Sequence, residues 1–268
     1  MTRFYNMYLV SAFTDKPFKG NSTGVIIDKG DLTEEEKLNI AKDINQSVTV
    51  FIRRMDTGVY ETRFYTPHGE IKLCGHATMA TFYAIAKNEY ILPIEEGINK
   101  IMQFTALGKV SVELEYENYQ IKNIYMNLKM KNEEKVENLD KVLSILGLKK
   151  EDIGLPYVNC MPKKISTGLC DIIIPVKNED ILKNVQVDFK EAKKLSEIED
   201  IISYHVFTTK DGINIHQRTF SPVIGVNEET GSGTSTAATM YYLHNNSYTK
   251  SNVIYSTQGT YVDRVSKV

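Results

Sequence analysis

The sequence lacks the features that place a chain in a membrane, on nucleic acid or around a nucleotide. No run of about 18 apolar residues occurs, so no transmembrane helix is predicted. The 32 Lys and Arg residues are mixed with 34 Asp and Glu, for a formal net charge of -2, and no basic block is available to neutralise phosphates. The nucleotide-binding patterns G-x-G-x-x-G and G-x-x-x-x-G-K-[ST] are absent as well. We therefore expect neither a membrane nor a nucleic acid as a partner.

Cysteine is also scarce. The three cysteines, Cys74, Cys160 and Cys170, are an odd number, and no Cys-x-x-Cys or histidine pair has the spacing of a zinc site. We expect no disulfide framework, no metal and no cofactor. Residues 1–18 show no charged leader followed by an apolar core and a small-residue cleavage site, so a cytoplasmic location is expected.

What the chain does contain is typical of a globular protein with two domains. Its 268 residues are 42% hydrophobic and 25% charged, which suits two domains of about 130 residues, each with its own core. Segments rich in β-branched and aromatic residues predict strands at 4–13, 22–28, 48–53 and 60–65. An amphipathic pattern predicts one helix over 132–150.

One arrangement of residues occurs twice. Arg63-Phe64-Tyr65-Thr66-Pro67 is followed by a short loop, by Cys74-Gly75-His76-Ala77-Thr78 and by a helical pattern. Arg218-Thr219-Phe220-Ser221-Pro222 is followed by a loop of nearly equal length, by Thr230-Gly231-Ser232-Gly233-Thr234 and by a second helical pattern. The shared order and spacing predict an internal duplication.

The duplication predicts an α+β fold of two pseudo-symmetric lobes. The polar stretch 116–122 breaks two strand-like runs, and we place the boundary there, between an N-terminal lobe of residues 1–118 and a C-terminal lobe of residues 119–268. Each lobe is expected to be a curled, mostly antiparallel sheet around a central helix.

The repeated loops lead into predicted helix starts, where unpaired N–H groups and the helix dipole favour an anion. If a pseudo-twofold axis relates the lobes, both helix starts face one cleft, which could hold a small carboxylate substrate. The alternative is that Gly75, Gly231 and Gly233 only form tight turns.

Side chains beside these loops can move protons. Cys74 stands at a predicted helix start, which lowers a thiol pKa, and the alternative is a buried packing role. His76 is a candidate general acid or base, or else a structural histidine. Glu228 and Glu229 precede the second loop, where one carboxyl could carry a proton, and the alternative is an ordinary acid pair at a helix start.

Motifs in both halves resemble the phenazine-biosynthesis PhzF-like family. They are residues 12–21 (AFTDKPFKGN), 45–47 (NQS), 63–67 (RFYTP) and 73–78 (LCGHAT), and in the second half 220–222 (FSP), 225–226 (GV) and 230–232 (TGS). The resemblance implies a diaminopimelate-epimerase fold, with two similar lobes, in a homodimer.

The resemblance also implies a changed active site. Isomerases of this family use a glutamate after Asn-x-Ser to move a proton on a small cyclic amino acid, but this chain has Val48 there. His76 and Ser232 match the family pattern directly. The family also has an aspartate in the second half, and the loop that contains it is shorter in this chain. If the missing residues follow position 229, Glu229 occupies the position of that aspartate. If the positions are counted back from Thr230 without a gap, Asn227 does.

Racemases and epimerases of the same superfamily place one cysteine in each loop. Cys74 matches the first, and Thr230 replaces the second. A pair of one Cys and one Thr also resembles the hydroxyproline dehydratases of the superfamily, in which a base removes the α-proton and a β-hydroxyl leaves.

We therefore expect a cofactor-independent, biosynthetic isomerase or epimerase that transfers a proton on a small amino or hydroxy acid in the cleft between the lobes. The candidate catalytic residues are Cys74, His76 and Glu229, and the candidate substrate-binding residues are Asn21, Ser47, Gly75, Thr230, Gly231 and Ser232. Two alternatives stay open: a dehydratase of the same fold, and a non-catalytic carboxylate-binding protein that has lost the glutamate at position 48.

Overall fold

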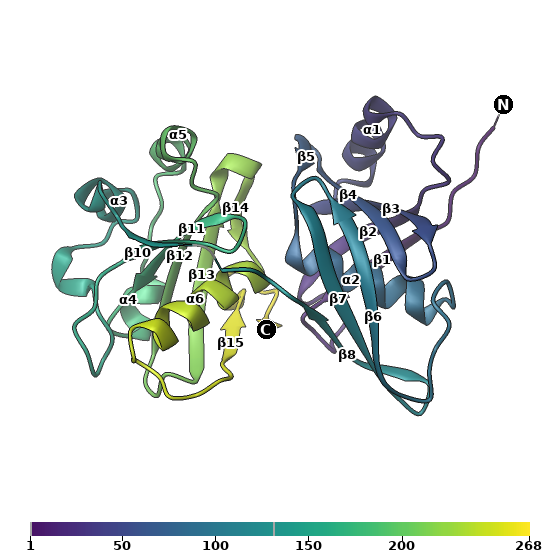
Figure 1. Ribbon diagram of the computed structural model, residues 1–268. Helices are drawn as coiled ribbons and strands as arrows, with labels where there is room; N and C mark the ends of the chain where they lie inside the picture. Colours follow the sequence, from purple (N-terminus) through teal and green to yellow (C-terminus); the bar gives the residue numbers. More distant parts are fainter. Residues whose placement is uncertain (1, 131) are drawn as a thin grey trace. The chain divides into compact units, whose positions relative to one another are not determined.

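The computed structural model describes residues 2–130 and 132–268. The chain divides into two compact units (Figure 1). The first unit runs to Ala12 and resumes over Asn21–Leu128, and the second contains Phe13–Gly20 and the chain from Lys129 onward. Within the described residues, no helix has the length and apolar character needed to cross a membrane.

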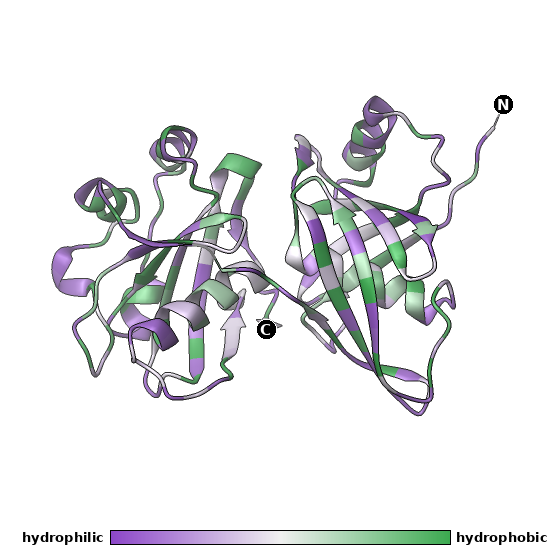
Figure 2. Ribbon diagram, viewed as in Figure 1, coloured by the Kyte–Doolittle hydropathy of each residue, from purple (hydrophilic) through white to green (hydrophobic). Residues whose placement is uncertain are grey.

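The first unit is built on an eight-stranded mixed sheet. Its strands, in spatial order, are β1 (Met7–Ala12), β2 (Asn21–Ile27), β3 (Val48–Asp56), β4 (Val59–Thr66), β6 (Glu96–Thr105), β7 (Gly108–Glu117) and β8 (Gln120–Met126), and β5 (Gly69–Ile71) pairs with β4. The pairs β2/β3 and β4/β6 are parallel, and the others are antiparallel. Alternating hydropathy is visible along β6 and β7 in Figure 2, as expected for strands with one buried face.

The second unit has a sheet of the same size. Its strands, in spatial order, are β16 (Ser266–Lys267), β15 (Tyr255–Gln258), β13 (Asn214–Ser221), β12 (Ser203–Thr209), β11 (Cys170–Pro175), β10 (Lys163–Ser166) and β9 (Glu133–Lys135), and β14 (Val226–Glu229) pairs with β13. Here β11/β12 and β13/β15 are the parallel pairs.

Helices complete both units. They are α1 (Glu34–Ile44) and α2 (Gly75–Lys87) in the first unit, and α3 (Leu139–Ile145), α4 (Glu179–Lys183), α5 (Phe189–Glu199) and α6 (Gly233–Asn245) in the second, with short 3-10 turns η1 (Lys150–Asp152), η2 (Pro222–Ile224) and η3 (Thr260–Val262). The start of α1 is fixed by a capping box, in which Thr33 accepts from the Glu36 N–H and Glu36 accepts from the Thr33 N–H.

The helix α2 packs on the first sheet through apolar side chains. Phe82 and Ile85 are fully buried in one cluster with Ile52, Val112 and Leu114. Burying a side chain of this size stabilises a fold by about 1.5–3 kcal/mol, so these contacts hold the helix against the sheet.

The second sheet is covered on both faces. On one face, Ala238 and Tyr242 of α6 pack with Ile173 and Phe207. The other face, which carries Ile172, packs with α3 and α5. Because neighbouring strand residues point to opposite faces, side chains at positions 171 and 173 lie on the α6 side.

The same pairing scheme occurs in both sheets. An antiparallel pair precedes a parallel pair, β2/β3 or β11/β12, and an antiparallel pair β3/β4 or β12/β13 follows. In each unit a short strand then pairs with the Arg-bearing strand and leads into a 13-residue helix, α2 or α6. The predicted α+β class with two similar sheet-and-helix halves is confirmed.

Two details of the prediction were wrong. The boundary after residue 118 lies too early, because β8 continues the first sheet to Met126, and residues 13–20 belong to the second unit. The helix predicted over 132–150 is shorter: Glu133–Lys135 forms strand β9 and only Leu139–Ile145 forms the helix α3, since pairing with β10 takes the first residues of the pattern.

Candidate active site

Cys74 is the N-cap residue of α2. Its backbone is extended, with φ at -143°, and its side chain makes no capping hydrogen bond. The Cys74 carbonyl accepts the first helical hydrogen bond, from Thr78 N, so the N–H groups of residues 75–77 precede the intrahelical ladder. The buried Gly75 begins the helix directly after the thiol. The thiol therefore lies at the positive end of the helix dipole.

His76 brings together three of the predicted residues. Its Nδ1 lies 3.4 Å from Cys74 Sγ and 3.2 Å from Asn21 Nδ2, and all three side chains are buried. Burial lowers the pKa of His76 to about 4, so the imidazole is neutral near pH 7. Because the Asn21 amide nitrogen can only donate, Nδ1 is an acceptor and the ring proton is on Nε2.

Val48 lies beside this group. It is buried in one apolar cluster with Leu73, Cys74 and Ala77. Position 48, where the resembled isomerases carry their glutamate, therefore has an apolar side chain in apolar surroundings in this chain. Ser47, the neighbouring candidate, is exposed and donates to the Ser22 carbonyl at 3.2 Å.

In the second half, the structure separates the three candidates for the family acid. Glu228 forms a two-point ion pair with Arg218 at 2.9 and 2.8 Å, and Arg218 Nη1 also donates to backbone carbonyls at the end of α4 and after it. Both partners are largely buried, which gives Glu228 a structural role. Asn227 is exposed.

Glu229 has a different environment. Burial raises the pKa of its carboxyl to about 7, with a further raising effect from Asp171 and an opposing hydrogen bond from Ser221. A carboxyl with a pKa near neutrality can both release and accept a proton under physiological conditions. Of the three candidates, Glu229 is the one whose chemistry fits an acid/base group.

The loop after Glu229 is held by hydrogen bonds within the second unit. Thr230 Oγ1 donates to the Gly20 carbonyl at 3.2 Å, and the Thr230 carbonyl lies so close to Gly259 that a Cβ there would meet it at 2.6 Å. Gly259 has φ at +75°, so only glycine suits this approach. Gly231 is buried between these residues and Ser232.

Ser232 is the N-cap of α6 and accepts from Ser235 N at 3.3 Å. Its own backbone N–H donates to Gln258 Oε1 at 3.1 Å. This N–H, at a helix start expected to offer unpaired N–H groups to an anion, is therefore paired with the Gln258 side chain, and an anion would have to replace Gln258 there.

Asp171 is a functional candidate that the sequence analysis missed. Its buried carboxylate accepts from Ser203 Oγ at 2.6 Å and from Ser235 Oγ at 2.8 Å, and burial raises its pKa to about 6. The available signal was an acid directly before the apolar run Ile172-Ile173-Ile174, which predicts a buried strand. A buried acid in such a strand costs free energy and calls for a role.

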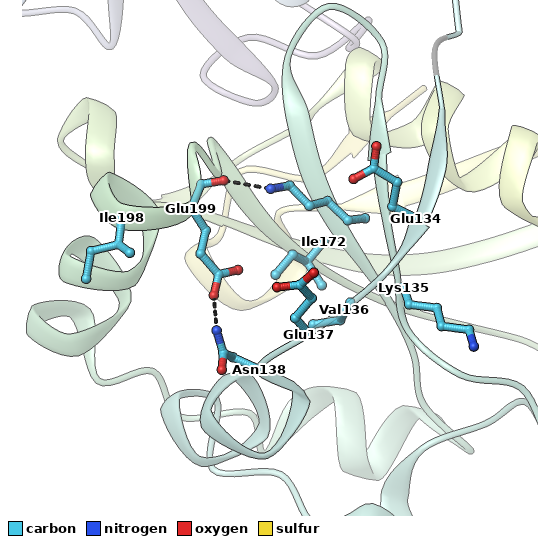
Figure 3. Close-up of a pocket in the computed structure, with 9 residues that line it drawn as sticks. Glu134, Lys135, Val136, Glu137, Asn138, Ile172, Ile198 and Glu199 are labelled. Atoms are coloured by element: carbon cyan, nitrogen blue, oxygen red, sulfur yellow. Dashed lines mark hydrogen bonds between the residues drawn. The ribbon is translucent and has the colours of Figure 1, made fainter.

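A polar pocket of about 400 Å³ lies elsewhere in the second unit (Figure 3). Its lining comes from the β9 region, β10, β11 and the end of α5, and is Glu134, Lys135, Val136, Glu137, Asn138, Lys164, Ile172, Ile198 and Glu199. Ile172 belongs to the face opposite α6, so this pocket is on the other side of the sheet from Asp171. Lys164 Nζ donates to the Glu199 carbonyl, and Asn138 donates to the Glu199 carboxylate.

Among residues 2–130 and 132–268, no group of three or more His, Cys, Asp or Glu side chains is arranged to hold a metal ion. The candidate acid/base groups are the thiol and imidazole of the first half and the carboxyls of the second.

Comparisons with known proteins agree with the fold and the motifs. The chain matches the family described as phenazine biosynthesis-like protein (PhzC-PhzF) over residues 10–268. It is 33% identical to an uncharacterised isomerase of Clostridium acetobutylicum over 252 residues, which cover 91% of this chain and 80% of that protein. A PhzF-family crystal structure from Bacillus anthracis has a TM-score of 0.81 at 24% identity, covering 98% of this chain and 88% of that one.

More distant structures share the fold alone. A probable proline racemase of Agrobacterium radiobacter K84 has a TM-score of 0.63 at 11% identity, covering 98% of this chain and 83% of that one. Curated relatives from several bacteria are named isomerases, which confirms the prediction of an enzyme of the isomerase or epimerase type. With its family match extending from residue 10 to residue 268, the chain belongs to the phenazine biosynthesis-like (PhzC-PhzF) protein family.

Proposed function

We propose that the protein is a cofactor-independent isomerase or epimerase that moves a proton on a small amino or hydroxy acid. Cys74, His76 and Glu229 are its acid/base groups, and Ser232 contributes to substrate binding. The expected cleft between the halves, the homodimer, the biosynthetic role and the cytoplasmic location stay predictions.

One observation carries the proposal: titratable groups occur at corresponding points of the two halves. In the first, Cys74 and His76 lie where the short strand β5 leads into α2. In the second, Glu229 ends the short strand β14 that leads into α6. A duplicated fold with a proton-transfer group at each equivalent helix start supports chemistry that needs one acid and one base.

The protonation states support the same chemistry. Burial keeps His76 neutral and able to accept a proton, and it keeps a proton on Glu229 up to a pH of about 7. Val48 cannot take part, so we propose that the reaction differs from the phenazine-pathway isomerisation.

The test is exchange of the α-hydrogen for deuterium. The full chain is incubated in D₂O with a panel of small amino and hydroxy acids, including proline and hydroxyproline, and the α-signal is followed by proton NMR. Removing a general acid or base should slow exchange by about 10²–10⁴-fold in Cys74→Ala and in Glu229→Gln. Cys160→Ala is the matched thiol control, because Cys160 is buried in the α6 core cluster.

The outcomes separate the alternatives. Exchange that is accompanied by loss of a β-hydroxyl, and not by racemisation, would show that the enzyme is a dehydratase instead of an isomerase. The pair of Cys74 and Thr230 is the sequence feature that favours this alternative. Binding of an acid without any exchange across the panel would contradict the proposal and support a carboxylate-binding protein.

A further inference from the structure

Asp171 is a buried carboxyl that the proposed proton transfer does not use. It begins the buried part of β11, is 2% exposed, and shares its face of the sheet with α6. Placing a carboxyl there is costly unless its oxygens receive hydrogen bonds. Two serine hydroxyls supply them, Ser203 to Oδ1 and Ser235 to Oδ2.

The internal repeat shows what position this carboxyl occupies. In the first sheet, Thr23 of β2 pairs with Val48 of β3 at the start of their parallel register. In the second sheet, Asp171 of β11 pairs with Ser203 of β12 at the start of theirs. The next residues support the same alignment. Thr49, which follows Val48, pairs with Tyr65 of β4, and Tyr204, which follows Ser203, pairs with Phe220 of β13. Ser203 is thus the counterpart of Val48, and Asp171 is the counterpart of Thr23. The second half therefore has an acid at a position where the first half has none.

A hydrogen-bond chain joins Asp171 to the N-cap of α6. Ser232 Oγ donates to Ser235 Oγ at 2.8 Å, and Ser235 Oγ donates to Asp171 Oδ2 at 2.8 Å. Each hydroxyl has one proton. With Asp171 ionised, the proton of Ser235 points to the carboxylate, and the proton of Ser232 points inward to Ser235.

Protonation of Asp171 reverses this chain. A proton on Oδ2 donates to Ser235 Oγ, the Ser235 proton turns to Ser232 Oγ, and the Ser232 hydroxyl turns its own proton away from Ser235, where a substrate carboxylate competes with Thr234 Oγ1, 3.3 Å away, to accept it. From Ser235, the route to Ser203 Oγ spans 3.5 Å, against 2.8 Å to Ser232, so Ser232 is the better acceptor. A proton on Oδ1 would instead donate to Ser203 at 2.6 Å, so the reversal requires the proton on Oδ2. No heavy atom needs to move.

We propose that Asp171 is a positioning residue that controls the Ser232 hydroxyl through Ser235, so that Ser232 donates to a substrate carboxylate only when Asp171 carries a proton. The inference rests on the proposed function, in which Ser232 contacts the substrate. Binding of a carboxylate would then take up one proton at Asp171, and the enzyme would bind its acid substrate more tightly below the pKa of Asp171 than above it.

The titratable surroundings of Asp171 are few. Burial raises its pKa to about 6, and the donors Ser203 and Ser235 act in the opposite direction. Glu229 of β14 is the carboxyl coupled to it, and Cys170 is its chain neighbour, with a thiol pKa raised to about 11 by burial. The neutral Cys170 thiol adds no charge, whereas the charge of Asp171 helps to keep a proton on Glu229. Asp171 is therefore the first of the two carboxyls to ionise as the pH rises.

The experiment follows the hydrogen-bond chain from Asp171 to Ser232 by NMR, in the absence of a substrate. In the full protein, the Asp171 carboxyl carbon and the Ser232 amide and Cβ signals are followed by NMR from pH 4 to 8, with Asp171→Asn used for assignment. We expect Ser232 to titrate with the same midpoint as Asp171, near 6. In Asp171→Asn the amide donates permanently to Ser235, so the Ser232 signals should stay in their low-pH position at every pH.

Ser235→Ala and Ser203→Ala form a matched pair, since each removes one donor to the same carboxylate and only Ser235 lies in the chain. Ser232 should stop titrating in Ser235→Ala and should continue to titrate in Ser203→Ala. Any one of three results would overturn the proposal. The Ser232 signals could stay constant while Asp171 titrates, they could titrate equally well in Ser235→Ala, or Asp171 could be ionised over the whole pH range.

A second measurement separates this proposal from the proposed function. Trifluoroacetate, a carboxylate that stays ionised over this pH range, is titrated into the wild type at pH 5 and pH 8 and followed by ¹⁹F NMR. Binding about a hundredfold tighter at pH 5 is expected, with no such difference in Asp171→Asn, because a carboxyl with a pKa of about 6 is mostly protonated at pH 5 and about one-hundredth protonated at pH 8. Equal binding at both pH values overturns the coupling. A titrating Ser232 with no binding at either pH overturns the carboxylate site of the proposed function instead.

Discussion

Replacing Glu229 by Gln tests the protonation state on which the proposed chemistry depends. The pKa of this carboxyl rises from an ordinary 4.5 to about 7 because burial disfavours its charge. In the unfolded chain the group ionises near 4.5, so between pH 4.5 and 7 the folded protein binds more protons than the unfolded one. The stabilisation is therefore complete below pH 4.5 and is lost as the pH rises through 7.

The size of the effect follows from the two pKa values. Each pH unit of difference corresponds to about 1.4 kcal/mol, which gives an upper limit of about 3 kcal/mol for the full interval. The carboxyl is only partly buried and is coupled to Asp171, so solvent and the neighbouring charge reduce this, and we expect about 1–2 kcal/mol. Gln has the same shape and never ionises. Glu229→Gln should therefore gain this amount over the wild type between pH 5 and pH 8.

Urea unfolding at pH 5, 6, 7 and 8, followed by circular dichroism, measures the difference. Glu197→Gln, which replaces an exposed acid on α5, is the matched control and should show no pH-dependent gain. A free-energy difference between wild type and Glu229→Gln that is the same at pH 5 and pH 8 would mean that Glu229 ionises normally in the folded state. Glu229 would then lose its claim to be the acid of the second half.

Three further outcomes are expected. Cys74 should alkylate faster than Cys160 with limiting iodoacetamide, read by mass spectrometry, because Cys74 starts a helix whereas burial raises the pKa of Cys160; equal labelling would make Cys74 a packing residue. The wild type should turn over the family's dihydro-hydroxyanthranilate about 10²–10⁴-fold more slowly than a relative with glutamate at position 48, and a comparable rate would show that Val48 marks no change of function. Arg218→Met should lower the free energy of unfolding by about 3–5 kcal/mol, since it leaves Glu228 buried and unpaired, and a loss below 1 kcal/mol would contradict that role.

The repeated strand, loop and helix were predictable because their signals are local. Arg, Ser/Thr-Pro and Gly occur in the same order before α2 and α6, and each of these residues restricts its own turn or helix start. The membership of residues 13–20 was not predictable from local pattern. It depends on backbone hydrogen bonds from Gly20 N to the Val265 carbonyl and from Lys267 N to the Phe13 carbonyl, which join segments far apart in the chain.

The candidate site was predicted by location more than by role. Cys74, His76 and Asn21 lie in one group, as the sequence predicted. The resemblance favoured Glu229, but two adjacent identical residues carry no local signal that shows why Glu228 differs from it. The difference depends on Arg218, ten positions earlier, whose guanidinium pairs with Glu228 and leaves Glu229 without this ion pair. Asp171 was missed for the same reason, since its serine partners come from β12 and α6.

Burial explains how a chain without the family glutamate can still supply both an acceptor and a donor of protons. Removal from water disfavours whichever form is charged, so the same physical cause acts oppositely on an imidazole and on a carboxyl. In the first half it holds His76 in the neutral form that accepts a proton, and in the second it holds Asp171 and Glu229 in the neutral form that donates one up to a pH of about 6 and 7. An apolar Val48 strengthens the first effect, because a carboxylate at that position would favour the imidazolium. With Val48 in place of a charged base, His76 stays neutral, and in the proposed reaction Glu229 is the carboxyl that carries the proton.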